Sequence, residues 1–208
     1  MENDVKEFLS ELLKQLKSID YIKPEDIPNI DLYMDQVTTF MDEQLAASKR
    51  YESDKILTKT MINNYAKNNL LPSPDKKKYS KEHVLTLLFI YYFKNILSIN
   101  DIRSILNPLT EKYFGNDDGF TMQDVYTEVF SLEAEESQKL LKDLGKKYKI
   151  AGETFENFPD EDQKFLHTFS FICMLSFDVY IKKMLIERMI DNLNEEKEDS
   201  SHKKTGSN

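Results

Sequence analysis

The sequence predicts an all-α protein, and three observations lead to that prediction. Apolar residues recur at three- and four-residue steps along most of the chain, which is the spacing of one face of a helix. Only 5 of the 208 residues are glycine, so few turns that need a positive φ can form, which argues against a turn-rich β fold. No segment shows the alternation of apolar and polar residues that is typical of a half-buried strand.

The first fifty residues predict two amphipathic helices with a proline-containing linker between them. Apolar side chains fall on one helical face over residues 4–18, and Pro24 and Pro28 then interrupt the pattern. The second helix is expected over residues 31–48. Asp31 suits its N-cap position, because the carboxylate can accept a hydrogen bond from a free backbone N–H.

Three capped helices are expected in the middle of the chain. The first covers residues 58–70, begins at a threonine and is followed by two prolines. Ser80 caps the second, which is so apolar that it must lie at the centre of a core, although Glu82 falls one position short of a standard capping box. Ser98 caps the third, which is expected to stop at Pro108.

The C-terminal half begins with the strongest turn signal of the chain. Asn-Asp-Asp-Gly at residues 116–119 predicts a turn and a domain boundary. Helices are expected beyond it over residues 121–129, 132–148 and 160–193. Residues 194–208 are polar and charged without an apolar anchor, so we expect them to be disordered.

The last predicted helix contains the most apolar stretch of the chain. Residues 165–186 include His167, Asp178, Lys182 and Lys183, so the stretch is interpreted as a buried helix and not as a membrane span. Its aromatic side chains are interpreted as core residues, with a dimer surface or a pocket for an apolar effector as the alternative. These aromatic residues are Phe165, Phe169, Phe171, Phe177 and Tyr180.

A single cysteine and the N-terminal residues bear on location. Cys173 has no intrachain disulfide partner, which indicates a reducing compartment, and its apolar neighbours predict a buried structural thiol. The chain opens with Met1-Glu2-Asn3-Asp4, which is acidic where a secretory signal would be basic. We therefore expect a cytoplasmic protein without a membrane partner.

The sequence shows no pattern typical of catalysis or metal binding. His83, His167 and His202 have no cysteine or carboxylate at a metal-ligand spacing on the same helical face. Glycine-rich phosphate loops and nucleophile motifs are missing from the sequence, and its acidic pairs are interpreted as helix-start and surface charges. We expect a protein that is not an enzyme and that holds no cofactor and no metal.

Positive charge is concentrated in one stretch of an acidic protein. The formal net charge is −9, yet residues 55–81 hold seven lysines and one aspartate. A basic docking face would produce this asymmetry. A solvated, solubilising surface would produce it equally well, so charge alone leaves both interpretations open.

The helix expected over residues 58–70 has two chemically different sides. Met61, Ile62, Tyr65 and Leu70 can reach a core from one side. Short polar side chains and lysine occupy the other side, and these groups hydrogen-bond base edges and contact phosphates. This second side carries Thr60, Asn63, Asn64 and Lys67.

The same stretch resembles the DNA-binding helix of the MerR family. From Thr58 to Pro74 it has, without a gap, a capped polar start, an apolar-polar-polar-Tyr step, a lysine and Leu-Leu-Pro-x-Pro. The likeness continues through Tyr79-Ser80-Lys81-Glu82 and through the Ser-capped helix that ends Ile102-Arg103-Ser104-Ile105-Leu106. It covers residues 56–106, about a quarter of the chain.

With residues 30–37 included, the sequence also resembles an uncharacterised bacterial family in which a MerR-like unit is joined to further helices. These resemblances imply a helix-turn-helix, a regulatory role, double-stranded DNA as partner, a homodimer on a palindromic site, and a small-molecule or protein effector. The contacts implied at the major groove and its phosphates are Thr58, Lys59, Thr60, Asn63, Asn64 and Lys67, and those at the flanking backbone are Lys76, Lys77 and Lys78.

The chain is thus expected to have four regions. They are residues 1–30, an amphipathic helix and linker; residues 31–115, the helix-turn-helix unit; residues 116–193, a helical region for dimerisation or signal input; and residues 194–208, the disordered tail.

The alternative is a helical protein-interaction module that kept the fold and does not bind DNA. MerR proteins usually carry arginines where Thr60 and Asn63 stand in this chain, and the wing between Pro74 and Tyr79 is shorter than the usual β-hairpin. Residues 132–148 do not sustain the heptads of a dimerisation coiled coil. Salt response separates the two hypotheses, because phosphate contacts weaken steeply with salt.

Overall fold

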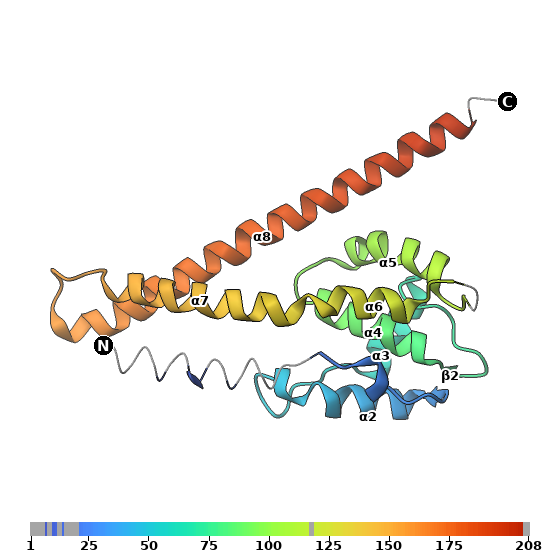
Figure 1. Ribbon diagram of the computed structural model, residues 1–208, viewed down its shortest axis with the longest axis horizontal. Coiled ribbons are helices and arrows are strands. Elements are labelled where there is room, and N and C mark those ends of the chain that lie inside the picture. Colours follow the sequence, from blue (N-terminus) through green and yellow to red (C-terminus); the bar gives the residue numbers. More distant parts are fainter. Residues whose placement is uncertain (1–6, 8–9, 12–13, 15–20, 117–118, 206–208) are drawn as a thin grey trace. The chain divides into compact units, whose positions relative to one another are not determined.

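The computed structural model, shown in Figure 1, describes most of the chain after residue 20. The described residues are 7, 10, 11, 14, 21–116 and 119–205, with the backbone alone for 133–135 and 198–205. The helix predicted over residues 4–18 therefore lies largely outside the described residues, as does the centre of the turn predicted at 116–119.

The described residues belong to two compact units. The helix–hairpin unit contains Tyr21–Phe130 and the chain from Leu185 onward, and the α7–α8 unit contains Ser131–Met184. Helices dominate both, which confirms the prediction of a mainly α-helical protein. The helix–hairpin unit comprises β1 (Leu32–Tyr33), α2 (Met34–Gln44), α3 (Lys59–Lys67), β2 (Lys78–Tyr79), α4 (Lys81–Phe93), α5 (Ile99–Tyr113), α6 (Met122–Ser131) and 3₁₀ turns at Pro24–Asp26 and Ala46–Ser48.

Helix α4 is the centre of the helix–hairpin unit, as predicted. Every residue from His83 to Tyr91 is buried, and the neighbouring helices pack around this stretch. A helix that is apolar on all sides has no face for water, so burial on every side is its stable arrangement. The core also takes in Met122 and Tyr126 of α6, and the Tyr126 hydroxyl donates to the carbonyl oxygen of Ile22 at 2.8 Å.

Two predicted boundaries are displaced. The domain boundary expected at residue 116 lies inside the helix–hairpin unit, because the buried side chains of α6 complete its core. Helix α5 does not stop at Pro108; it continues to Tyr113. Proline removes one intrahelical hydrogen bond, and the nine helical residues that precede it keep the helix intact.

A short strand pair replaces part of a predicted helix. Strand β1 pairs antiparallel with β2, Leu32 opposite Tyr79 and Tyr33 opposite Lys78. The expectation that the chain has no strands is therefore wrong at these four positions. Helix α2 consequently starts at Met34 with Tyr33 as its N-cap, not at Asp31, and the Gln36 side chain accepts a hydrogen bond from the Tyr33 N–H at 2.8 Å.

The α7–α8 unit consists of α7 (Glu133–Gly152) and the first part of α8 (Asp160–Thr205). Lys147 of α7 pairs with Asp178 of α8, and the rings of Tyr148 and Phe171 meet edge to face at 5.3 Å. Helix α8 does not end at Leu193, and the disorder predicted from residue 194 is not found through Thr205, because the glutamates and lysines of this stretch favour helix.

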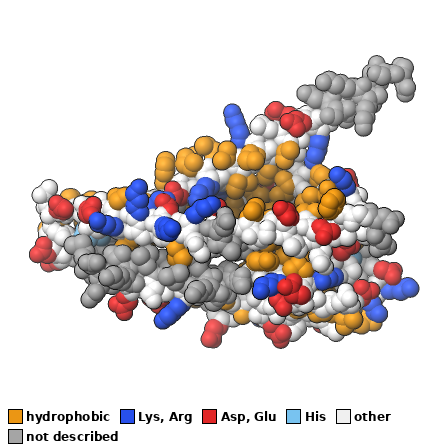
Figure 2. Space-filling model, viewed as in Figure 1, with side chains coloured by type: hydrophobic (Ala, Val, Ile, Leu, Met, Phe, Trp, Pro, Cys, Tyr) orange, Lys and Arg blue, Asp and Glu red, His pale blue; other side chains and the backbone are white. Residues whose placement is uncertain are grey.

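The predicted burial of α8 is wrong for most of its aromatic residues. Phe171 is buried, but Phe165, Phe169, Phe177 and Tyr180 are exposed, and hydrophobic side chains gather along the helix surface in Figure 2. Cys173, predicted to be buried, is exposed as well. Apolar content alone does not say which neighbours a helix has. None of the described helices has the length and apolar character needed to cross a membrane.

Candidate nucleic-acid interface

Helix α3 separates its residues into the two sides that the sequence predicts. Ile62 and Tyr65 are buried, and Met61 packs against the core from the same side. The opposite side is exposed and consists of Lys59, Thr60, Asn63, Asn64 and Lys67. The exposed side of α3 thus presents only amide, hydroxyl and ammonium groups.

The start and end of α3 are fixed by local hydrogen bonds. The Thr58 side chain accepts a hydrogen bond from the Met61 N–H at 3.2 Å, so Thr58 is the N-cap as predicted. Asn69 has a φ of +56°, the left-handed conformation that ends helices, and α3 ends three residues before the predicted Leu70. Because its hydroxyl already serves as the cap, Thr58 can reach DNA only at the expense of that bond.

Two side chains of the β1–α2 junction connect α3 with the hairpin that ends in β2. Asp35 pairs with Lys59 of α3, and the Lys78 ammonium lies over the Tyr33 ring, 5.5 Å from its centroid. Tyr33 and Asp35 are two residues apart, so the start of α3 and the hairpin meet at one short segment. This places two parts of the predicted interface together.

The segment predicted as a wing is a tight hairpin that contains three lysines. The Lys78 N–H donates to the carbonyl oxygen of Asp75 at 2.8 Å, and Asp75 and Lys78 form a bridge pair. Lys76 and Lys77 occupy the two central positions with φ of +47° and +65°. Positive φ at both central positions is the geometry of a type I′ turn, which normally selects asparagine or glycine. Both lysines are exposed, as a backbone contact to DNA would require.

The predicted contact residues differ in whether their side chains already interact with another residue of the protein. Within the described part of the chain, the side chains of Thr60, Asn63, Asn64, Lys67, Lys76 and Lys77 make no hydrogen bond, ion pair or ring contact. Lys59 is paired with Asp35, Lys78 lies on Tyr33, and Thr58 caps its helix. Sequence spacing does not predict the contacts that Asp35 and Tyr33 make, because contacts between residues distant along the chain leave no periodic pattern.

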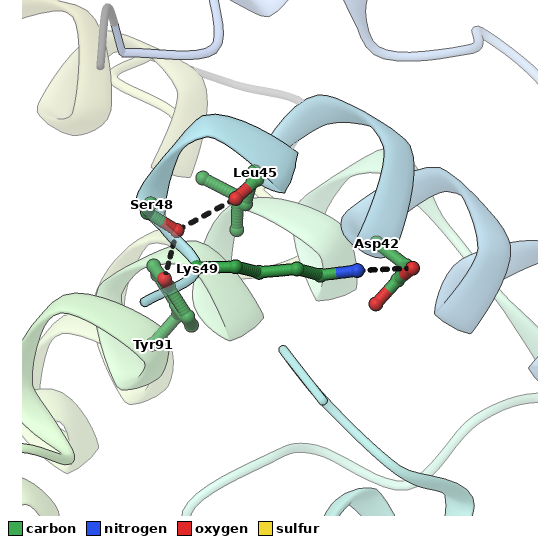
Figure 3. A network of polar contacts seen from close by, with 5 residues as sticks. All are labelled: Asp42, Leu45, Ser48, Lys49 and Tyr91. Carbon is green, nitrogen blue, oxygen red and sulfur yellow. Dashed lines mark hydrogen bonds and ion pairs between the residues drawn. The ribbon is translucent and has the colours of Figure 1, made fainter. Parts of the chain in front are cut away.

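A polar network holds the connection from α2 to α3 against α4 (Figure 3). The Ser48 hydroxyl donates to the Leu45 carbonyl oxygen at 2.6 Å and hydrogen-bonds the Tyr91 hydroxyl of α4. Lys49 lies 2.7 Å from Asp42, and this hydrogen bond lowers the pKa of the Asp42 carboxyl group. The end of α2 is thereby fixed on the central helix.

The far end of the same connection is held by a lysine. The Lys94 ammonium donates to the carbonyl oxygen of Ile56 at 2.9 Å, and burial lowers the pKa of Lys94. Ile56 and Leu57 are themselves buried immediately before Thr58. The residues that position the start of α3 are therefore anchored by packing and by a charged hydrogen bond.

His83 joins the hairpin, α4 and the loop after α3. It stands at the third position of α4, where its Nδ1 accepts the Ser80 N–H at 3.0 Å and so takes the part of a capping-box glutamate. Its ring meets Tyr79 and Phe114 edge to face. Burial lowers the pKa of His83, opposed by the backbone of Ser73 and the charge of Asp31, and its Nε2 has no hydrogen-bond partner among the described residues.

Residues 22–129 match the family model described as a domain of unknown function, DUF1836. This match spans just over half of the chain. The chain belongs to the DUF1836 family. The matched residues of the DUF1836 domain coincide with the continuous part of the helix–hairpin unit, Tyr21–Phe130. Comparison with curated proteins and with solved structures finds no match.

The exposed side of α3 and the hairpin lysines all lie inside the DUF1836 domain. The residues that hold these elements in place, namely the network of Figure 3, Lys94 and His83, also lie inside the domain. Among the described residues of the whole chain, no three histidine, cysteine, aspartate or glutamate side chains gather as metal ligands would. The chemistry that this surface offers is therefore hydrogen bonding and positive charge.

Proposed function

We propose that the DUF1836 domain of this protein is a MerR-like helix-turn-helix that binds double-stranded DNA and that the protein regulates transcription. One observation carries the proposal. The exposed side of α3 presents two asparagines, a threonine and two lysines, and only Lys59 among them has a partner in the described structure. Asparagine pairs with adenine N6 and N7 in the major groove, and lysine contacts phosphates or guanine.

In this arrangement α3 reads the groove, and the hairpin contacts the adjoining phosphates. Helix α2, packed beside α3, is the first helix of the motif. The lysines of the Asp75–Lys78 hairpin supply the backbone contacts of a short wing. Phosphate contacts fix the orientation of the protein, and the asparagine contacts specify sequence.

We further propose that the protein acts as a homodimer through α8. Phe165, Ile172 and Val179 recur at seven-residue intervals on this helix and are all exposed. A seven-residue apolar repeat favours pairing of helices. Two copies would then read the two halves of a palindrome, and light scattering at micromolar concentration gives the mass that tests this.

The alternative is a protein-interaction module without DNA binding. Asp35 favours it, because an exposed carboxylate beside Lys59 repels phosphate at the start of α3. The absence of arginines from α3 points the same way. Such a module would use the same exposed helix surfaces for a partner protein.

Selection from random duplex DNA at low salt tests the proposal. The wild-type protein is expected to enrich a sequence motif, and the variant Asn63→Ala/Asn64→Ala/Lys67→Ala is expected to enrich none. A matched control, Asn157→Ala/Asn192→Ala/Lys146→Ala, removes the same groups from exposed positions elsewhere and should behave like wild type. Circular dichroism verifies that each variant is folded. Absence of enrichment by the folded wild-type protein would reject DNA reading and favour the alternative.

A further inference from the structure

The helix–hairpin unit contains an apolar groove that the proposed function does not use. One wall comes from the end of α4, the segment that connects it to α5, and α5, with Phe93, Ile96 and Ile105. The other wall is the C-terminal part of α8, with Ile186, Met189 and Leu193. The groove has a volume of about 290 Å³, and every side chain that lines it is apolar.

The groove is open to solvent although α8, which forms one of its walls, packs against the core. Ile190 of α8 is 3% exposed and belongs to the core, so α8 is in contact with the unit at this position. Its neighbours Met189 and Leu193 are 58% and 47% exposed, and Ile96 across the groove is 43% exposed. Apolar surface gathered in one concave place gains free energy when an apolar ligand removes it from water.

A positively charged group stands at one end of the groove. Pro108 has no N–H, so the Ser104 carbonyl oxygen lacks its usual partner one turn further along α5. The Lys197 ammonium of α8 donates to this oxygen at 2.9 Å. Ser104 precedes the groove residue Ile105, and Lys197 follows the groove residue Leu193 by one turn, so both elements place the ammonium at the same end.

Lys197 keeps capacity for a second partner. An ammonium group has three N–H donors, and the described structure uses one of them on the Ser104 carbonyl. The Ser104 carbonyl therefore holds the ammonium group in place and leaves two of its N–H donors for another partner. A carboxylate that entered here could accept the remaining donors in a charge-assisted hydrogen bond.

We propose that this groove binds a free single-chain amphiphile, with its hydrocarbon tail among the apolar side chains and its anionic head at Lys197. The volume sets the length of the tail. A water-sized group fills about 30 Å³, so about 290 Å³ holds roughly ten methylene-sized groups. Decanoate has the matching length and charge, and it serves as the probe.

Isothermal titration calorimetry with monomeric decanoate tests the proposal on the full-length protein. Wild type is expected to bind decanoate more tightly than 1-decanol, and decyltrimethylammonium most weakly. Lys197→Met should weaken decanoate binding about 5- to 10-fold and leave 1-decanol binding within about twofold, because only the anion uses the ammonium. Met189→Glu should weaken binding of decanoate and 1-decanol at least about tenfold by placing a charge in the apolar groove.

Control variants keep the outcome unambiguous. Met184→Glu and Lys182→Met change exposed residues of the same helix outside the groove and should bind like wild type. Ile96→Gln, on the opposite wall, replaces Met189→Glu if that variant does not fold. Binding only to anionic lipid vesicles, no binding of decanoate, or equal loss in the control variants would overturn the proposal. None of these readings depends on DNA binding.

Discussion

At the scale of single residues, Asp35 determines how much of the positive charge of α3 is available to an anion. It pairs with Lys59, and both side chains are largely exposed, at 74% and 59%. Exposed ion pairs contribute little to stability, so this pair can open at small cost when a stronger anion arrives. We therefore expect Asp35 to affect anion binding far more than folding.

Replacing Asp35 by asparagine should tighten DNA binding several-fold at low salt. The freed Lys59 adds about one phosphate contact, so the plot of log K against log salt should steepen by about 0.9. Fluorescence anisotropy over a salt series measures both effects. Asp191→Asn, an exposed substitution of equal charge change on α8, is the control. Identical behaviour of the two variants would show that Lys59 does not contact DNA.

His83 connects the pH of the solution to the stability of the helix–hairpin unit. It is buried as the neutral imidazole, because burial lowers its pKa in the folded protein below the ordinary value of about 6.5. The unfolded chain therefore binds more protons than the folded protein when the pH falls below about 6.5. Stability contributed by the neutral ring is present above that pH and is lost as the pH falls through the lowered pKa.

The variant His83→Gln should lose this part of the pH dependence. Below pH 6.5 the free energy of unfolding of wild type should fall by up to about 1.4 kcal/mol per pH unit from this group alone. Glutamine can accept the Ser80 N–H in the same capping position but does not titrate. Urea unfolding between pH 5 and 7.5 measures the difference. An unchanged slope in His83→Gln would refute the assignment.

At the scale of elements, the hairpin at Asp75–Lys78 has lysines at two positions where the backbone conformation is unfavourable for a residue with a Cβ. Lys76 and Lys77 adopt positive φ, a conformation that costs residues with a Cβ about 1 kcal/mol or more each. Glycine would form the same turn without that strain. Lysines at these positions are consistent with a functional need for their ammonium groups.

Lys77→Gly should therefore stabilise the protein while weakening DNA binding. Relief of the strained φ should raise the free energy of unfolding by about 1 kcal/mol, after the entropy that glycine adds to the unfolded chain. The lost ammonium should lower affinity and reduce the salt slope by about 0.9. Lys67→Gly removes the same charge from a helix and should destabilise by up to about 1 kcal/mol. Thermal unfolding measures the stability of both variants and fluorescence anisotropy their DNA binding. A shift of stability in the same direction for Lys77→Gly and Lys67→Gly would contradict this account.

The elements that could be predicted are those specified by local chemistry. Thr58 and Ser98 cap their helices through contacts three residues away, so the sequence alone locates them. The same holds for α4, whose apolar residues specify burial on every side. Two-residue strands carry no periodicity, so the β1–β2 pair could not be predicted from spacing.

Other features depend on partners distant along the chain. The Asp35–Lys59 pair joins two helices, and only the folded structure brings the two residues together. Cys173 lies in an apolar run yet is exposed, because apolar neighbours in sequence do not ensure neighbours in space. Most of the exposed side of α3 could be predicted, since one helical period places Thr60, Asn63, Asn64 and Lys67 together, and the structure adds Lys59.

At the scale of the whole molecule, charge is distributed unevenly. The protein has a formal net charge of −9, while residues 55–81, which include α3 and the hairpin, hold seven lysines and one aspartate. A negatively charged protein is repelled by DNA except where such a face meets it, which favours one orientation of binding. Helix α8 runs through both compact units and carries the exposed apolar surface that we assign to the second copy.

The central claim is that α3 and the hairpin bind DNA through their lysines, and a salt series tests it most directly. Anisotropy of a labelled duplex should give a linear fall of log K with log salt. Lys67, Lys76, Lys77 and Lys78 should together give a slope of about −3.6 per protein chain while Asp35 remains paired with Lys59. The triple variant of α3 should lower that slope by about 0.9. No binding at low salt, or an affinity insensitive to salt, would contradict the claim.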